Sequence, residues 1–296
     1  MKPYYWLRHS ARVFLAQTLP GPPRHARALI VIGTPRSGTS WLARTLSQSK
    51  GVAYYYEPDR QLVESIPYYR ARYLTGADQD DHLKTEADRM FHGKYCTGRT
   101  IWGSSLGQLL AVPVAQTVLL KWVWLVGCLE WLAANYPNVR VIKIVRHPIK
   151  QFLSWRDRGW TPNIDQFLKE ESLTSGPLNP YVDLCRGATT YWQTAACFWG
   201  ITTLLLHRTH PSGWVMKEHE WYQKDRVARV RQLFDELNLD WNDRIESGLM
   251  EDPHRKNDKQ HKKFVMQDWK GVVEKKKITT TYGEYWQHSI CRTTKI

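Results

Sequence analysis

The sequence predicts an α/β fold in which a parallel β-sheet carries helices on both faces. Short apolar runs of strand length alternate along the chain with segments of helical spacing, and a glycine-rich loop joins the first run to a helix. With 296 residues, 42% of them hydrophobic, the chain is long enough to bury one substantial core. We therefore expect a single domain at 28–296 with inserted loops, preceded by a basic, proline-containing arm at 1–27.

Five apolar runs bounded by turn residues predict the strands of this sheet. They lie at 28–32, 52–56, 118–124, 139–145 and 214–217. Helical spacing follows at 41–46, 125–135, from Pro148, at 189–207 and at 226–239. Residues 59–116 are polar with weak periodicity, and we expect an insertion or lid there rather than core. Because parallel sheets bind ligands beyond the carboxyl ends of their strands, the functional site is expected at that edge.

The charge of the chain indicates an anionic partner. The formal net charge is +14, from 42 Lys and Arg against 28 Asp and Glu. Nucleic acid, an acidic membrane surface, an acidic polysaccharide and a polyphosphorylated nucleotide all fit such a charge. The 15 Trp and 15 Tyr suit a cleft that binds sugars or rings.

The cysteines and the N-terminus indicate the compartment. The five cysteines are scattered, without a C-x-x-C pair, which favours neither a disulfide framework nor a thiolate metal site. Arg8, His9 and Arg12 interrupt the only apolar stretch near the N-terminus, so we find no secretion signal or membrane span. We predict a soluble, cytoplasmic protein without a metal site.

The loop at 33–40 has the features of a phosphate-binding loop. Its spacing is that of G-x-x-x-x-G-K-[ST], but Thr39 occupies the lysine position, which suits a triphosphate with magnesium poorly. The cation is Arg36 instead, and the glycines let backbone N–H groups approach an anion at the start of a helix. The loop is therefore expected to hold a short anionic group.

The run G-T-P-R-S-G-T-S-W-L resembles the 5′-phosphosulfate-binding loop of sulfotransferases that use PAPS (3′-phosphoadenosine 5′-phosphosulfate). The resemblance implies a P-loop-containing, sulfotransferase-like fold whose inserted loops take the acceptor. It further implies that Arg36, Ser37, Gly38, Thr39 and Ser40 hold the phosphosulfate, and that Arg36 stabilises charge on the transferring group. Trp41 would pack near the adenine or serve as an ordinary core residue.

A second segment resembles the part of this family that binds the 3′-phosphate. Arg146 ends the fourth predicted strand, and Ser154 lies eight positions on, two helical turns along, where it can face the same phosphate. The run at 262–270 also resembles the C-terminal segment that closes over the nucleotide, which we assign to the basic stretch 252–277. The resemblance implies that Lys262 and Lys263 are further 3′-phosphate ligands. The alternative is a solvated basic loop, because Phe264 and Gln267 stand where the family usually has glycine.

Glu57 is the candidate for the general base that takes the proton of the acceptor hydroxyl. It ends the second predicted strand, and its Glu-Pro pair resembles that of carbohydrate sulfotransferases of the GlcNAc-6-O type. Taken together, the motifs are most similar in style to these enzymes and to bacterial sulfotransferases. The alternative is a strand-end carboxylate paired with Arg36 or Arg60. Lys121 ends near the same edge and is expected to stabilise charge on the bridging oxygen.

These observations predict a PAPS-dependent sulfotransferase that releases PAP, the 3′,5′-bisphosphate, and acts on an acceptor hydroxyl, most simply that of a carbohydrate. A small alcohol or phenol is the alternative acceptor. A P-loop kinase or NTPase and a basic nucleic-acid-binding protein are the rival functions; the first lacks the loop lysine, and the second lacks a recognised binding motif.

Overall fold

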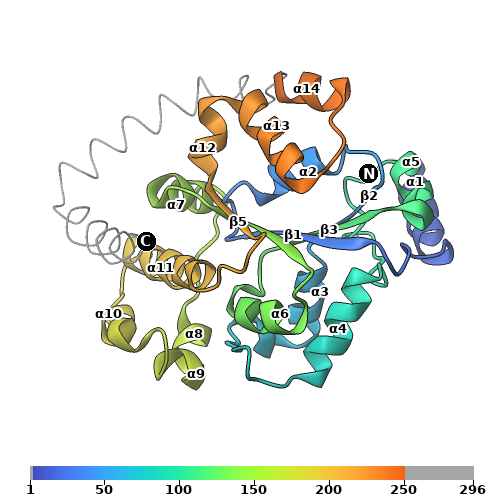
Figure 1. Ribbon diagram of the computed structural model, residues 1–296. Coiled ribbons are helices and arrows are strands. Elements are labelled where there is room, and N and C mark those ends of the chain that lie inside the picture. Colours follow the sequence, from blue (N-terminus) through green and yellow to red (C-terminus); the bar gives the residue numbers. More distant parts are fainter. Residues whose placement is uncertain (1–2, 251–296) are drawn as a thin grey trace.

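The computed structural model describes residues 3–250, and side-chain burial from residue 10 onward. Five parallel strands form one sheet in the order β2-β3-β1-β4-β5. The strands are β1 (Arg27–Gly33), β2 (Val52–Tyr56), β3 (Thr117–Trp122), β4 (Arg140–Val145) and β5 (Val215–Glu218). The predicted α/β fold with a parallel sheet is confirmed, and helices cover both of its faces (Figure 1).

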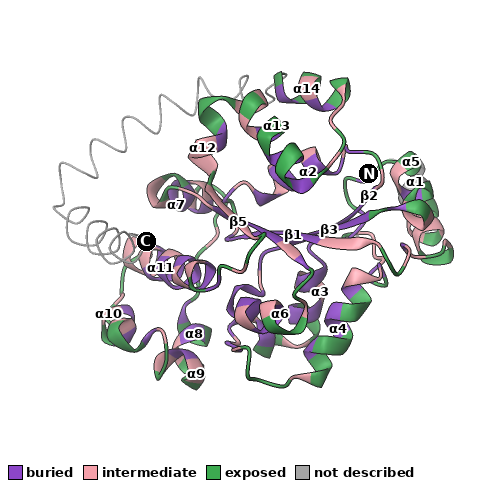
Figure 2. Ribbon diagram, viewed as in Figure 1, coloured by how far each residue is buried: buried purple, intermediate pink, exposed green. Residues whose placement is uncertain are grey.

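Alternating side chains of the central strand divide between two hydrophobic layers. In β1, Leu29 and Val31 belong to one buried cluster, whereas Ile30 and Ile32 belong to the other. This alternation follows from the two-residue repeat of a strand, and it requires apolar cover on both faces. The sheet accordingly lies as a buried layer between partly exposed helices (Figure 2).

Two groups of helices supply this cover. On one face lie α2 (Thr39–Leu46), α12 (His219–Lys224), α13 (Arg226–Leu237) and α14 (Asp243–Met250). On the other lie α3 (Pro58–Ser65), α4 (Asp81–Phe91), α6 (Leu129–Asn135) and α11 (Tyr191–Arg208). α11 begins at a capping box of Thr190 and Gln193.

The remaining described elements are short, apart from α1 and α7. They are α1 (Pro3–Thr18), η1 (Pro67–Arg70), α5 (Leu106–Leu110), η2 (Val112–Val114), η3 (Val126–Cys128), α7 (Pro148–Arg156), α8 (Asp165–Lys169), α9 (Glu171–Thr174), η4 (Asn179–Tyr181) and α10 (Val182–Arg186). The segment predicted as an N-terminal arm thus contains a helix. Among the residues described, no helix has the length and apolar character needed to cross a membrane.

Two expectations need correction. Residues 59–116 do contribute to the core, because α3 and α4 bury Leu62, Leu83 and Met90 against the sheet. The weak periodicity of this segment reflects short helices whose apolar stripes are only two or three residues long. The third strand also ends earlier than predicted, at Trp122, because the next two backbone N–H groups donate to the side chain of Asp59.

Candidate active site

The candidate site lies where β1, β2, β3 and β4 end. The loop 34–38 follows β1, Glu57 follows β2, Lys121 lies near the end of β3, and Arg146 follows β4. All four strands are parallel, so their carboxyl ends meet at one edge of the sheet. The structure therefore brings together the strand-end residues that were predicted from separate parts of the sequence.

The loop after β1 turns sharply before α2 begins at Thr39. Arg36 and Gly38 have positive φ angles of 70° and 103°. A Cβ atom on Gly38 would lie 2.2 Å from Cδ2 of His219, so glycine is required there for space as well as for conformation. The turn directs backbone N–H groups at the first turn of α2 toward the site.

Two side chains of α7 hold this loop in place. Trp155 donates from Nε1 to the carbonyl oxygen of Pro35 at 2.8 Å. Gln151, which is fully buried, donates from Nε2 to the same carbonyl at 2.6 Å and also to the hydroxyl of Thr34. Neither residue was predicted from the sequence. The only available signal was their place on the helix that carries Ser154.

The two predicted anchors contact each other directly. Arg36 donates from Nε to Oγ of Ser154 at 3.0 Å, and Arg146 donates from Nη1 to the carbonyl oxygen of Arg36 at 3.0 Å. Burial lowers the pKa of both guanidinium groups, and a second cation adds to this effect in each case. At the pH of the cell both stay charged, because their ordinary pKa lies far above it.

Two of the residues predicted to bind the donor each have a buried polar atom without a hydrogen-bond partner. These atoms are the hydroxyl oxygen of Ser37, a fully buried residue, and Nε of Arg146. Buried donors that lack partners carry a desolvation cost, which a bound anion relieves. An anionic ligand therefore fits this part of the site.

α12 forms the side of the loop next to Gly38. His219 lies at the first position of α12, and burial together with Arg146 lowers its pKa to about 4. It is therefore a neutral imidazole at physiological pH. Trp41 is half-buried and packs edge-on against His219 and Tyr222, with ring centroids 6.1 and 5.8 Å apart. Trp41 therefore packs at the edge of the buried cluster, next to the loop after β1.

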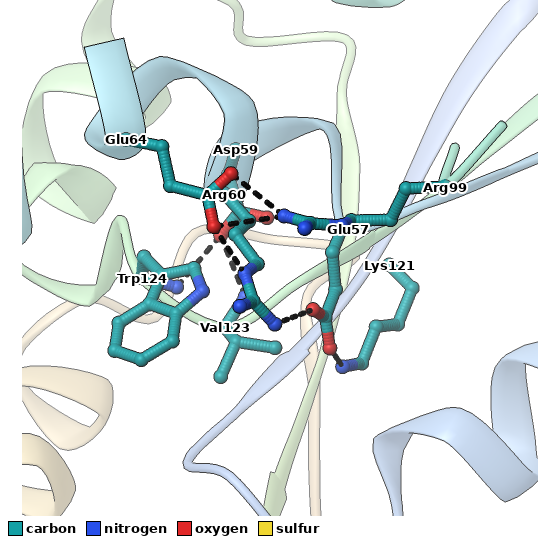
Figure 3. Close-up of polar contacts among 8 residues, drawn as sticks. All are labelled: Glu57, Asp59, Arg60, Glu64, Arg99, Lys121, Val123 and Trp124. Carbon is teal, nitrogen blue, oxygen red and sulfur yellow. Dashed lines mark hydrogen bonds and ion pairs between the residues drawn. The ribbon is translucent and has the colours of Figure 1, made fainter. Parts of the chain in front are cut away.

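Glu57 and Lys121 form a buried ion pair. The exposed fractions are 8% for Glu57 and 3% for Lys121, and Nζ of Lys121 contacts Oε1 of Glu57 (Figure 3). The other carboxylate oxygen lies 3.7 Å from Nη1 of Arg60, so the expected alternative partner is present as well. Burial lowers the pKa of Lys121, and the negative charge of Glu57 opposes that shift.

The backbone of Glu57 is also held. Its φ angle of 47° is left-handed, and its N–H group donates to the carbonyl oxygen of Lys121 at 2.9 Å. Left-handed backbone in a residue other than glycine is uncommon and is concentrated at functional sites.

Tyr56 and Trp102 are two aromatic residues beside this pair that the sequence analysis missed. The Tyr56 hydroxyl is within hydrogen-bonding reach of Ser40 and Glu57, and Nζ of Lys121 lies 4.8 Å from its ring centre. The ring of Trp102 packs edge-on against Tyr56 at 5.2 Å and is 52% exposed. An open aromatic surface therefore begins next to the Glu57 carboxylate.

A model of the sulfotransferase family matches residues 28–243. The chain belongs to the sulfotransferase family. The match includes the loop after β1, Glu57, Lys121 and Arg146. The prediction of a PAPS-dependent sulfotransferase is confirmed at the level of family and enzyme class, which sets aside the kinase and nucleic-acid-binding readings.

Solved sulfotransferase structures resemble this sulfotransferase. The enzyme from Alicyclobacillus acidocaldarius is 17% identical with a TM-score of 0.39, and the match covers 72% of this chain and 81% of that one. STF1 from Mycobacterium tuberculosis H37Rv is 14% identical with a TM-score of 0.39, covering 83% and 74%. Mouse SULT7A1, complexed with PAP, is 16% identical with a TM-score of 0.34, covering 80% and 67%. No curated protein matches the chain.

The C-terminal candidates of this sulfotransferase, Lys262 and Lys263, lie outside the described residues, as does the basic stretch 252–277.

Proposed function

We propose that this sulfotransferase moves a sulfuryl group from PAPS to a hydroxyl of a carbohydrate by in-line displacement, with Glu57 as the general base. The observation that supports it most is the contact of Arg36 with both Ser154 and Arg146. These residues belong to the two segments that resemble the 5′ and 3′ binding elements of the family. Their contact supports a single ligand whose two anionic ends reach both segments.

The donor would lie across the loop and the end of β4. Arg36, Ser37, Gly38, Thr39 and Ser40 would hold the phosphosulfate, with the free Ser37 hydroxyl as one donor. Arg146 and Ser154 would hold the 3′-phosphate, and Arg146 still has an unpartnered Nε for it. Trp41 would lie on the adenine side, and Lys262 and Lys263 would close over the nucleotide.

The reaction then breaks one bond and forms another at sulfur. The acceptor oxygen bonds to sulfur as the bond between sulfur and the bridging oxygen of PAPS breaks, and PAP leaves with the electron pair. Glu57 takes the hydroxyl proton. Arg36 and Lys121 stabilise the charge that develops on the transferring group and on the bridging oxygen.

The ion pair of Glu57 and Lys121 fits these roles. Lys121 orients the glutamate carboxylate until an acceptor arrives, and it presents a positive charge at the reacting centre. A buried, paired carboxylate is also shielded from bulk water, which limits transfer of the sulfuryl group to water.

A carbohydrate acceptor is favoured by Trp102. An exposed indole that packs against Tyr56, next to Glu57, offers a flat apolar surface for one face of a sugar ring. A small alcohol or phenol remains the alternative acceptor, because a phenol ring can stack on the same indole.

Calorimetry with PAP and transfer of labelled sulfate from PAPS to a panel of glycans, phenols and alcohols test the proposal. Arg36→Ala should lose both PAP binding and transfer. Glu57→Gln should keep PAP affinity within about twofold and lose transfer by about 100-fold or more. Glu86→Gln is the matched control, since Glu86 is a buried glutamate paired with Arg89 at 2.9 Å on α4. Absence of PAP binding by the wild type, or full transfer by Glu57→Gln, contradicts the proposal.

A further inference from the structure

Asp59 is a fully buried carboxylate two residues after the proposed base. It lies in the first turn of α3, with 0% of its surface exposed. Its Oδ2 accepts hydrogen bonds from the backbone N–H groups of Val123 and Trp124, both at 2.6 Å (Figure 3). The side chain thus joins the start of α3 to the segment that follows β3.

These bonds fix the position of the reacting pair. Lys121 lies two residues before Val123, and its carbonyl oxygen accepts from the N–H group of Glu57 at 2.9 Å. Glu57 and Asp59 therefore hold the end of β3 at two points, Glu57 at Lys121 and Asp59 at the two residues after Trp122. The left-handed backbone of Glu57, φ 47°, needs such support, because surrounding contacts must offset the cost of that conformation.

Asp59 also contributes charge. Glu57 at the end of β2 and Lys121 on β3 both act on it electrostatically; Arg60 of α3 contacts Glu57, and Arg70 of η1 lies 4.7 Å from the Trp124 ring. Burial raises the pKa of Asp59 to about 7, although the two N–H donors oppose that shift. Its Oδ1 is buried without a hydrogen-bond partner. Nothing in the donor-binding role of the loop uses this carboxylate.

We propose that Asp59 is a positioning residue for sulfuryl transfer: it aligns Glu57 with Lys121 by fixing the segment that follows β3. This inference rests on the proposed role of Glu57. Asp59 itself is too deeply buried to contact the acceptor. Its effect reaches the reaction through the end of β3, which carries Lys121.

Because Asp59 gains its charge near neutral pH, the direction in which turnover changes with pH can be predicted. As the pH rises through about 7, Asp59 ionises. The ionised carboxylate accepts the two backbone hydrogen bonds from Val123 and Trp124 more strongly than the neutral acid does, and so holds the end of β3 more firmly. Turnover at saturating substrate should therefore rise through a step near neutral pH.

Asp59→Asn tests the inference, because the amide oxygen can still accept both N–H bonds but carries no charge. With the acceptor of highest turnover in the panel, kcat should fall on the order of 10-fold or more, the step near pH 7 should vanish, and PAP affinity should stay within about twofold. Asp80→Asn is the matched control. Asp80 also accepts a backbone bond, from Leu83 at 2.8 Å, but at the start of α4. It should lower the melting temperature without moving the pH profile.

The outcomes separate the two proposals. A wild type without PAP binding or transfer refutes the proposed function. An active wild type with no step between about pH 6 and 8 refutes the role of Asp59, even if Asp59→Asn fails to fold. A folded Asp59→Asn that keeps both kcat and the step refutes it as well.

Discussion

Arg36 donates a hydrogen bond from Nε to the hydroxyl of Ser154 at 3.0 Å, across 118 positions of sequence. The first residue belongs to the loop after β1 and the second to α7. Since α7 also holds the loop through Gln151 and Trp155, one helix positions the Arg36 side chain and carries the Ser154 hydroxyl beside it. The two segments of the proposed donor site are therefore joined by hydrogen bonds.

Ser154→Ala should weaken PAP binding by about 10- to 100-fold, because it removes a hydrogen bond to a charged group and frees the Arg36 side chain. Turnover at saturating PAPS should change much less. Isothermal calorimetry with PAP measures the first effect, and labelled-sulfate transfer measures the second. Ser65→Ala is the control, since the Ser65 hydroxyl donates to a carbonyl within α3. Equal PAP affinity in Ser154→Ala and wild type would contradict the assignment.

Gly38→Ala should abolish donor binding. The new Cβ would lie 2.2 Å from the His219 ring, and the φ angle of 103° disfavours any side chain. Gly159→Ala provides the control, because Gly159 also has a positive φ of 63° but nothing within 4 Å of its Cβ. Both variants are measured by PAP-induced change in melting temperature, and only Gly159→Ala should keep that change. A PAP-stabilised Gly38→Ala would show that the loop does not need its observed shape.

Trp102→Ala should raise the KM for a glycan acceptor by about 10-fold or more and leave PAP affinity unchanged. The indole packs against Tyr56 and lies under the Arg44 guanidinium, and its exposed part is the surface proposed to contact the sugar rather than the donor. Initial rates at saturating PAPS with the panel acceptors give this KM. Leu110→Ala removes a 54% exposed apolar side chain on α5 and should have no effect. An unchanged KM for glycans together with a raised KM for phenols would favour the small-molecule acceptor.

Lys143 should make stability rise with pH above neutrality. It is fully buried on β4, donates to the carbonyl oxygens of Leu206, at 2.8 Å, and Thr209, and burial lowers its pKa to about 8. The unfolded chain binds the Lys143 proton more tightly than the folded chain does. The buried charge therefore lowers the free energy of unfolding by its full amount below about pH 8, and this loss disappears as the pH approaches 10.5, the ordinary pKa of lysine.

Urea unfolding of wild type and Lys143→Met at pH 7.5 and pH 10 measures this effect. The free energy of unfolding of the wild type should gain on that of the variant between the two pH values, by about 2 kcal/mol. A constant difference between the two proteins would show that Lys143 has the same pKa in the folded and unfolded states.

The sequence by itself determined the parallel α/β sheet and the placement of Arg36, Glu57, Lys121 and Arg146 at its carboxyl edge. Strand length, turn residues and the spacing of the loop are local properties, so they can be predicted from the amino-acid sequence alone. The family resemblance of the loop and of the Arg146 segment was equally local.

Only the tertiary structure decided which of these residues touch. β2 pairs with β3 so that Tyr56 lies opposite Lys121, and this register gives Glu57 a lysine as its closest partner. The alternative interpretation of the sequence had named Arg36 or Arg60 as the partner of Glu57. Gln151, His219 and Asp59 acquire their roles in the same way, from partners far away in sequence. A hydrogen bond or ion pair depends on distances of a few ångströms between separate elements, and those distances follow from packing that no local pattern encodes.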